Sequence, residues 1–523
     1  MKKHVFREGL FASPTLCMIV FIISSCLFTA LAQGTDFFYS SHYTKVFFLF
    51  LIFTCYVFLF GYFYISHRLD EKTLCCMIVF LGVLLRVSFV LLSGLYERQH
   101  DAGAYTGIAT DTINPGHIGY IEFIYKFHKL PDINPYELFA YYHPPLHHII
   151  SYLFLQINIW LGVTEELAFE NLQILPLLYS CLCMVVTYRI LKTLEIDGKG
   201  LYLGLLFVVL HPSTIYMSGS VNNDMLTILF MCLIMLGSFQ WIREKSLRNL
   251  IKLALYIGFG MITKLNAAAL AIPLGLLFLL HFLSIIRKKN KSAILQTFKN
   301  YCIFAAIVIP LGLCWVIRNL IRFGEKPGVP VPGETNPMYT EPFSLWARLG
   351  IPSLSDWNFA FPFHPISAKA CCNTWVIMFH TSIFAEEYPV DLPNILLIMC
   401  QFAFFLTVVF GIITTVLLFV VAKNKKTLSE DKIFLIFGYI VILVSFALFV
   451  IKYPYTCSSD FRYIAISIVY IAIALGLGNK YYTSEPAITR KEKALQIGMH
   501  IINLGILFIL GSLTIVNQFW GRW

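Results

Sequence analysis

Apolar runs of about twenty residues recur along the entire 523-residue chain, and this repetition constrains the fold more than any other feature. A run of that length can cross the roughly 30 Å hydrocarbon core of a bilayer as a helix, because a helix satisfies its own backbone hydrogen bonds. Mean hydropathy is +0.73 and only 13% of the residues are charged. A chain this apolar cannot bury its surface as a water-soluble domain does. We therefore predict an all-α polytopic membrane protein.

Charged breaks between the runs divide the chain into about thirteen predicted transmembrane helices. The first run is interpreted as a retained span, because no clear small-residue cleavage site follows it and many similar runs come after it. The predicted spans are 10–32, 44–66, 74–94, 170–192, 199–218, 222–242, 249–263, 265–285, 300–320, 392–421, 432–451, 461–478 and 494–516.

Basic residues indicate the orientation of these spans. With the N-terminus in the cytoplasm and the C-terminus outside, most of the 39 Lys and Arg residues fall on the inner side, as the positive-inside rule requires. This also accounts for the net charge of +10, so we expect no nucleic-acid partner. Residues 146–162 are apolar enough to span, but an added span would turn the basic clusters at 287–291 and 423–426 outward. We predict that 146–162 forms an amphipathic helix on the outer surface.

The predicted organisation has five parts. Inner loops are short and basic and contain neither a GxxxxGK[ST] loop nor a GxGxxG fingerprint, which disfavours chemistry with a cytosolic nucleotide. The parts are 1–94 with three spans, 95–169 as an outer loop with surface helices and a candidate catalytic Asp, 170–320 as a transmembrane catalytic module, 321–391 as a second outer loop, and 392–523 with the C-terminal spans.

Two acidic residues occupy predicted outer positions. Asp101 follows the third span, where a carboxylate among aromatic side chains at the membrane boundary can accept a proton from a hydroxyl. A lone loop aspartate is more often simply solvated. Asp224 ends the run Asn222-Asn223-Asp224 at the second outer turn. It could cap a helix or share acid–base work with Asp101.

Three basic residues, Lys264, Arg318 and Arg462, lie at predicted outer ends of spans. Each could be an ordinary interfacial anchor, but cations there also suit the phosphate of a phosphate-linked lipid. Lys264 is the least ordinary, because it lies in a very tight turn between two spans, where charge is costly. Arg86, inside the third span, could pair with an outer carboxylate or with helix carbonyls.

Histidines gather in the first outer loop. Pro144-Pro145 can start a helix, which would place His147 and His148 in its first turn. Together with His143 they could bind a metal or contact an anionic phosphate, although interfacial histidines are often ordinary surface residues. No cofactor is predicted; a divalent metal could bind through these histidines and Asp224.

In their order along residues 74–470, these motifs resemble those of the GT-C fold membrane glycosyltransferases. The resemblance is specifically to bacterial members of glycosyltransferase family 39, which are similar to protein O-mannosyltransferases and to the aminoarabinose transferase of lipid A. Two spans more than in those families precede Asp101, and no large soluble C-terminal domain or MIR insert follows, so the acceptor is not identified. The motifs are His100-Asp101, Tyr142-His143-Pro144-Pro145-Leu146, Asn223-Asp224, Thr263-Lys264, Arg318-Asn319 and Phe461-Arg462-Tyr463.

The resemblance implies an inverting transfer of a sugar from a polyprenyl-phosphate donor to a hydroxyl of a glycan, lipid or protein, at the external face of a bacterial cell membrane. A transporter or flippase of a lipid-linked sugar, or a lipid-linked oligosaccharide ligase or polymerase, are the alternatives; a transporter would place charges near the midplane. The implied roles are Asp101 as general base and Lys264 and Arg462 as phosphate ligands. We further expect Asp224 to be an acceptor-orienting residue or second acid and Arg318 to be a third phosphate ligand. The expected donor and cavity residues are His100, His117, Tyr142, His143 and His147.

Overall fold

The computed structural model describes residues 13–35, 41–95, 113–328, 336–353, 368–369, 371–385, 394–484, 486 and 488–519. Within these residues every regular element is a helix, and the one β feature is an isolated bridge between Tyr339 and Tyr455. The predicted all-α, multi-pass membrane class is confirmed. The first helices are α1 (Pro14–Gln33), α3 (His42–Ile65), α4 (Glu71–Leu92), α5 (Gly116–Phe127), α6 (Leu146–Trp160), α7 (Glu165–Glu170), η1 (Asn171–Gln173), α8 (Ile174–Thr193), α9 (Gly198–Leu210), α10 (Pro212–Tyr216), α11 (Asp224–Arg243) and α12 (Leu247–Thr263).

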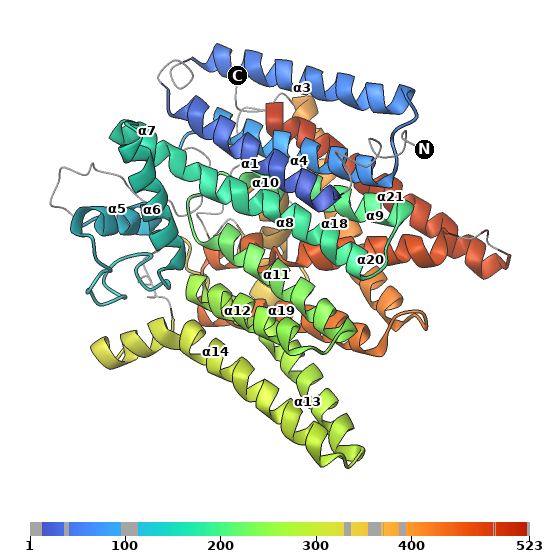
Figure 1. The fold of residues 1–523 in the computed structure, drawn as a ribbon. Coiled ribbons are helices and arrows are strands. Elements are labelled where there is room, and N and C mark those ends of the chain that lie inside the picture. The colour runs from blue at the N-terminus through green and yellow to red at the C-terminus, as the bar shows by residue number, and fades with distance from the viewer. Residues whose placement is uncertain are drawn as a thin grey trace, which may run out of the picture.

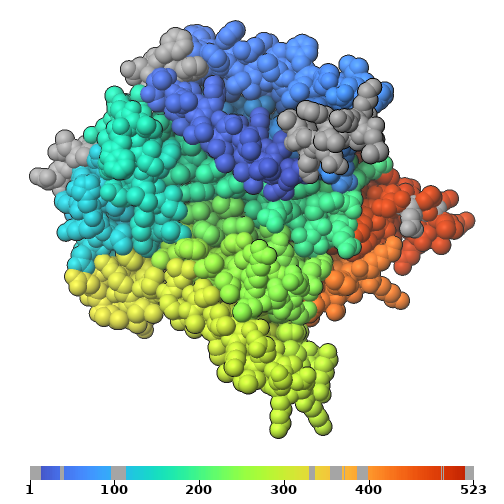
Figure 2. Space-filling model, viewed as in Figure 1, coloured from blue at the N-terminus to red at the C-terminus, as the bar shows by residue number. Residues whose placement is uncertain are grey.

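The second half of the chain continues the helical bundle. Figure 1 shows the long hairpin of α13 and α14 projecting from it, and Figure 2 shows the same hairpin protruding from the space-filling surface. The remaining helices are η2 (Leu265–Leu270), α13 (Ala271–Arg287), α14 (Lys291–Phe323), α15 (Leu345–Leu349), α17 (Thr374–Phe384), α18 (Asn394–Lys423), α19 (Ser429–Lys452), η3 (Thr456–Ser459), η4 (Phe461–Ile464), α20 (Ser467–Tyr482) and α21 (Arg490–Phe519).

Each predicted span overlaps a helix or an interrupted pair of helices, but two of them contain no helix long enough to cross a membrane. In the described part of the chain, ten helices are long and apolar enough to cross a membrane, or eleven if the bent pair Thr456–Ile464 and Ser467–Tyr482 forms one span. The predicted span 199–218 is interrupted after the 13-residue helix α9, because proline at Pro212 has no N–H to continue it. The predicted span 249–263 corresponds to α12, which has 17 residues.

Helix α6 corresponds to the segment predicted to lie on the surface. It has 15 residues, and Figure 1 shows it lying across the direction of the long helices. Its buried side chains include the polar residues His147, His148 and Ser151, whereas Leu153 and Trp160 are 53% and 78% exposed. A helix that turns polar groups into the protein and apolar groups outward suits a membrane interface. The structure therefore agrees with the prediction that this helix does not span.

The predicted outer residues share one end of the bundle. At the start of α11, Asp224 contacts Lys264 and Arg462, which belong to the turns after α12 and before α20. At the other end of α11, Arg243 pairs with Asp431 of α19 at 2.8 Å. The structure thus places the predicted inner and outer groups at opposite ends, while the face exposed to the cytoplasm stays a prediction.

Arg86 is fully buried in α4 and bonds to helix carbonyls and hydroxyls. Its guanidinium donates to the carbonyl oxygens of Val208 at 3.3 Å and Val209 at 3.0 Å, in the last turn of α9. It also donates to the hydroxyls of Ser180 at 2.8 Å and Thr214 at 2.7 Å. The last carbonyls of a helix have no partner within the helix and carry partial negative charge, which favours a cation there. Of the two readings left open by the sequence, the structure selects the carbonyl partners.

Candidate active site

The turn before α11 fixes the position of Asp224. The side-chain oxygen of Asn222 accepts a hydrogen bond from the backbone N–H of Asp224 at 2.9 Å, which is an Asx turn. The amide of Asn223 donates to the carbonyl oxygen of Thr263 at 3.1 Å and ties the start of α11 to the end of α12. The two asparagines therefore shape the turn, and the carboxylate of Asp224 stands at the first position of α11.

Lys264 lies between α12 and η2 in an extended backbone conformation, with φ −159° and ψ 129°. This single extended residue separates two helices, which accounts for the tight turn seen in the sequence. Its side chain is 13% exposed and forms an ion pair with Asp224, whose side chain is 7% exposed. Charges this far from water need a partner, and Asp224 supplies it.

Arg462 brings a second cation to the same carboxylate. Its Nη1 lies 3.8 Å from Oδ2 of Asp224, and its side chain is 3% exposed. Two contacts hold η4 in place: Asp460 accepts from the backbone N–H of Arg462 at 2.7 Å, and the Thr381 hydroxyl accepts from the backbone N–H of Phe461 at 2.9 Å. Lys264 and Arg462 therefore share the carboxylate of Asp224, and two cations that share one carboxylate can also bind an anionic ligand.

Tyr463 links the two cations. The Nζ of Lys264 and the Cζ of Arg462 each lie 5.1 Å from the centroid of its ring, within cation–π range. The sequence motif Phe461-Arg462-Tyr463 thus supplies a cation and the ring against which both cations pack. We define Asp224, Lys264, Arg462 and Tyr463 as the charge cluster.

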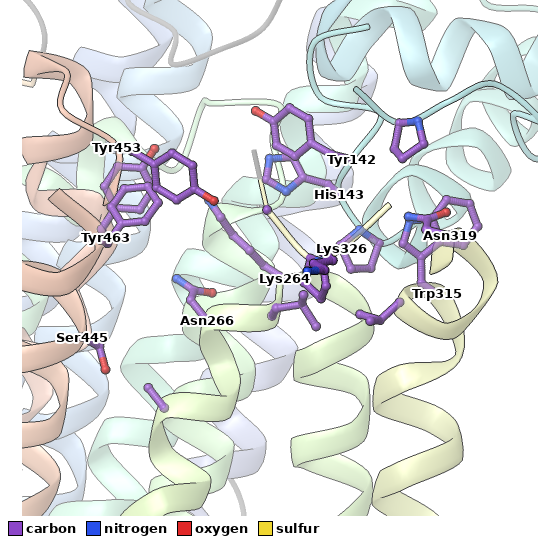
Figure 3. A pocket seen from close by; sticks show the side chains of 18 of the residues that line it. Tyr142, His143, Lys264, Asn266, Trp315, Asn319, Lys326, Ser445, Tyr453 and Tyr463 are labelled. Atoms are coloured by element: carbon purple, nitrogen blue, oxygen red, sulfur yellow. The ribbon is translucent and has the colours of Figure 1, made fainter. Parts of the chain in front are cut away.

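A cavity of about 320 Å³, called cavity 1, adjoins the charge cluster. Figure 3 shows Lys264 between Tyr453 and Tyr463 on one side and Trp315 and Asn319 on the other. Both polar and apolar side chains line its wall, a combination that can hold an anionic head group joined to a hydrocarbon chain. Its other polar lining residues include Tyr136, Tyr142, His143, Asn266, Glu325, Lys326 and Ser445, and its apolar ones include Met231, Leu265, Ile442, Phe446 and Phe449.

Three of the outer-loop histidines form a cluster that reaches cavity 1. The Nδ1 of His117 lies 3.0 Å from Nε2 of His148 and the rings are within 4° of parallel, so one imidazole donates to the other. The ring of His143 packs 5.2 Å from that of His117 and lines cavity 1. His147 lies on α6 with its Nε2 3.4 Å from the Ser151 hydroxyl and does not line that cavity.

Burial keeps these histidines neutral. It lowers the pKa of His147 from the ordinary value of 6.5 to about 3, with His117 adding to the effect and Asp224 opposing it. Burial likewise lowers the pKa of His117 to about 3, with Asp224 opposing the shift and Lys264 and Arg462 adding to it. Neutral imidazoles can relay or accept a proton or pack as rings, whereas they do not provide a fixed positive charge for a phosphate.

The low pKa of His147 predicts a pH-dependent stability. In the unfolded chain it binds a proton near pH 6.5, so between about pH 6.5 and pH 3 the unfolded state carries more protons than the folded state. The free energy of unfolding should therefore fall as the pH drops through this window. Replacing His147 with Gln should reduce that fall, as measured by unfolding in detergent at pH 7 and pH 5. His500→Gln, at an exposed position, is the control, and an unchanged pH dependence in His147→Gln would contradict the assignment.

Arg318 lies apart from the charge cluster. Its guanidinium donates to the carbonyl oxygen of Pro131 at 2.6 Å, lies 3.3 Å from Asp132, and stacks over Trp315 at 4.5 Å. Arg322, one turn later, also pairs with Asp132. The structure thus shows Arg318 attaching the first outer segment to the end of α14, and its predicted role as a phosphate ligand stays a prediction.

Asp101 and His100 lie outside the described residues, and their roles also stay predictions. Among the described residues, no group of three or more His, Cys, Asp and Glu side chains is arranged to hold a metal ion. His143 and Asp224 therefore have other contacts in this structure: a ring stack and an ion pair.

Several residues of cavity 1 were not predicted from the sequence. Trp315 and Asn319 lie on the buried face of α14, three residues before and one residue after Arg318. The motif Arg318-Asn319 therefore marked the correct turn of this helix. Tyr136, Glu325 and Lys326 come from two outer segments that meet only in the fold, where the amide of Asn134 donates to Glu325 at 3.1 Å. No short motif in the sequence marks that meeting.

Part of the chain is similar to a known protein family. Residues 142–315 match the family of dolichyl-phosphate-mannose-protein mannosyltransferases. The match confirms the predicted resemblance to GT-C membrane glycosyltransferases, and it covers less than half of the chain. It includes His143, Asp224 and Lys264 and ends before Arg318 and Arg462. A search of curated proteins found no match.

Three solved structures are similar to this chain at 13–14% identity. An oligosaccharyltransferase of Archaeoglobus fulgidus, crystallised with a tethered acceptor peptide, aligns over 86% of this chain and 55% of its own at a TM-score of 0.47. The arabinofuranosyltransferase AftD from Mycobacteria aligns over 86% and 27% at 0.43. ArnT from Cupriavidus metallidurans, bound to undecaprenyl phosphate, aligns over 84% and 77% at 0.34. These likenesses are too distant to support an argument about activity.

Proposed function

We propose that this glycosyltransferase-like chain transfers a sugar from a polyprenyl-phosphate donor to an acceptor hydroxyl on the non-cytoplasmic side of the membrane. The observation that carries the proposal is the charge cluster, because two nearly buried cations face one carboxylate beside a cavity that is part polar and part apolar. A lipid phosphate fits this combination of charge and lining. The family match over residues 142–315 agrees with this substrate class.

The donor would bind with its phosphate at Lys264 and Arg462 and its first hydrocarbon units against Met231 and Phe446. Lysine acts as a point charge and arginine can bind two phosphate oxygens at once. Both would stabilise the negative charge that grows on the phosphate as it departs. Asp224 already neutralises part of the cluster and would orient the acceptor once the phosphate competes for its cations.

The proposed reaction is one inverting displacement. The acceptor oxygen attacks the anomeric carbon, the bond from that carbon to the phosphate oxygen breaks, and its electron pair leaves with the polyprenyl phosphate. Asp101 accepts the proton of the acceptor hydroxyl. Exclusion of water by the walls of the cavity would favour the acceptor over hydrolysis.

Replacing Lys264 with Ala should weaken binding of polyprenyl phosphate by about 10- to 100-fold, because a hydrogen bond to a charged group contributes about 1.5–3 kcal/mol. Binding can be measured with purified protein in nanodiscs and radiolabelled polyprenyl phosphate. Lys245→Ala is the matched control, since Lys245 pairs with Glu430 at 3.0 Å at the opposite end of the bundle. Equal affinity in the two variants would show that Lys264 is an interfacial anchor and would remove the basis of the proposal.

A further inference from the structure

A second and larger cavity of about 620 Å³, called cavity 2, lies among the C-terminal helices. Its wall is mainly apolar or aromatic, with a few Ser and Thr hydroxyls, and includes side chains from α9, α17, α18, α19, α20 and α21. At one end Trp346, Pro352 and Trp375 line it, and the indole of Trp375 donates to the carbonyl oxygen of Leu349 at 2.7 Å. An apolar cavity of this size favours hydrocarbon over water or a polar solute.

Cavity 2 extends from the outer segments into the helical bundle. Its lining begins at the outer segments 346–352 and 375–383 and reaches Thr415 on α18, Tyr439 on α19 and Ile506 on α21. Tyr439 and Ile506 lie near the middle of α19 and α21, and Thr415 lies eight residues before the end of α18 at Lys423. A cavity that begins at the outer segments and continues this far along apolar helices suits a single hydrocarbon chain entering from the outer side.

One short helix separates the two cavities. Phe461 and Ile464 of η4 line cavity 2, whereas Tyr463 of the same helix lines cavity 1. Between them, Arg462 points at Asp224. Helix α19 has the same division, with Leu443 facing cavity 2 and Phe446 facing cavity 1. A chain in cavity 2 would therefore end within one helix turn of the charge cluster, on the side away from cavity 1.

We infer that cavity 2 holds the hydrocarbon chain of the acceptor, which makes the acceptor an amphiphilic lipid of the outer leaflet. The inference rests on the proposed function and names its acceptor class. The donor already has an apolar wall for its own chain in cavity 1, beside the cations that would hold its phosphate. A second lipid with its chain in cavity 2 would present its polar head, and a hydroxyl, at the charge cluster from the opposite side of η4.

The inference is tested by filling cavity 2. Thr407 of α18 lines the cavity, whereas Val409 of the same helix is 49% exposed on the outer surface of the bundle. Thr407→Phe and Val409→Phe are therefore matched variants. A lysophospholipid carrying a photoactivatable group in a 16-carbon chain is the probe, and labelled peptides are identified by mass spectrometry. We expect saturable labelling between 375 and 383 that Thr407→Phe removes and Val409→Phe preserves.

Competition and transfer distinguish the other occupants. Excess polyprenyl phosphate should leave the labelling unchanged; loss of labelling would assign cavity 2 to the donor chain and overturn the inference. With polyprenyl-phosphate sugars labelled in the sugar, transfer should yield an acid-stable, lipid-soluble product that Thr407→Phe abolishes. Transfer that Thr407→Phe leaves intact would make the bound chain a structural lipid, and a water-soluble or protein product would also overturn the inference.

The two levels of proposal can fail separately. Thr407→Phe should bind polyprenyl phosphate with the affinity of the unmodified protein, because it does not line cavity 1. If Lys264→Ala leaves that affinity unchanged, the proposed donor site is wrong whatever cavity 2 contains. If Lys264→Ala weakens it while the lysophospholipid does not label cavity 2, the donor site stands and the acceptor class is wrong.

Discussion

Replacing Asp101 with Asn is expected to lower the rate of sugar transfer by about 10²- to 10⁴-fold, the range over which a positioned general base accelerates proton transfer. Asparagine keeps the size of the side chain but its amide does not accept the proton of an attacking hydroxyl. Binding of polyprenyl phosphate should be unchanged, because the proposed phosphate ligands are Lys264 and Arg462. The measurement is single-turnover transfer from a labelled polyprenyl-phosphate sugar, together with donor affinity.

Asp224→Asn is the informative comparison for Asp101→Asn. Asp224 contacts two cations, which make its carboxylate a weaker base. Its replacement would leave Lys264 and Arg462 without this carboxylate. We expect this variant to change the affinity for polyprenyl phosphate, which Asp101→Asn should not do. Near-normal transfer by Asp101→Asn would eliminate Asp101 as the base.

Local sequence patterns predicted the parts of this site that lie next to helix ends. Asn223-Asp224 and Thr263-Lys264 are short motifs that can be recognised in the sequence. The first stands at the start of α11 and the second at the end of α12, and long apolar runs predict both helices. Since those runs also fix which helix ends share a side, the topology places Asp224, Lys264 and Arg462 at one end of the bundle, whereas their contact depends on how the helices pack. The surface position of α6 followed in the same way, because an added span would have reversed the basic clusters.

Features that depend on contacts between distant segments were not predictable. Arg318 was grouped with the other outer cations, yet its guanidinium bonds to the loop at Pro131 and Asp132, which no motif connects to α14. Cavity 2 arises where several helices and the outer segment 346–352 pack around a space, and no motif in the sequence connects these segments. The break after α9 could have been read from Pro212, but the surrounding apolar run concealed it.

Replacing Arg86 with Met is expected to cost about 3–5 kcal/mol of stability, because the loss leaves buried hydrogen-bond acceptors without their donor. Val208 and Val209 would be most affected, since the last carbonyls of α9 have no partner within that helix. Methionine has a similar length and fills the same space, so the effect isolates the lost polar contacts from a cavity. The free energy of unfolding in detergent is the appropriate measurement.

Arg189→Met on α8 provides the matched control, because Arg189 is exposed and the same substitution there should change stability by less than about 0.5 kcal/mol. Arg86→Lys should fall between the two, since a lysine keeps the charge but donates in fewer directions than the five-donor guanidinium. The folded fraction of Arg86→Met should still bind polyprenyl phosphate, because Arg86 does not line cavity 1. Equal stabilities for Arg86→Met and Arg189→Met would contradict the structural role, and lost binding with normal stability would instead place Arg86 in the substrate path.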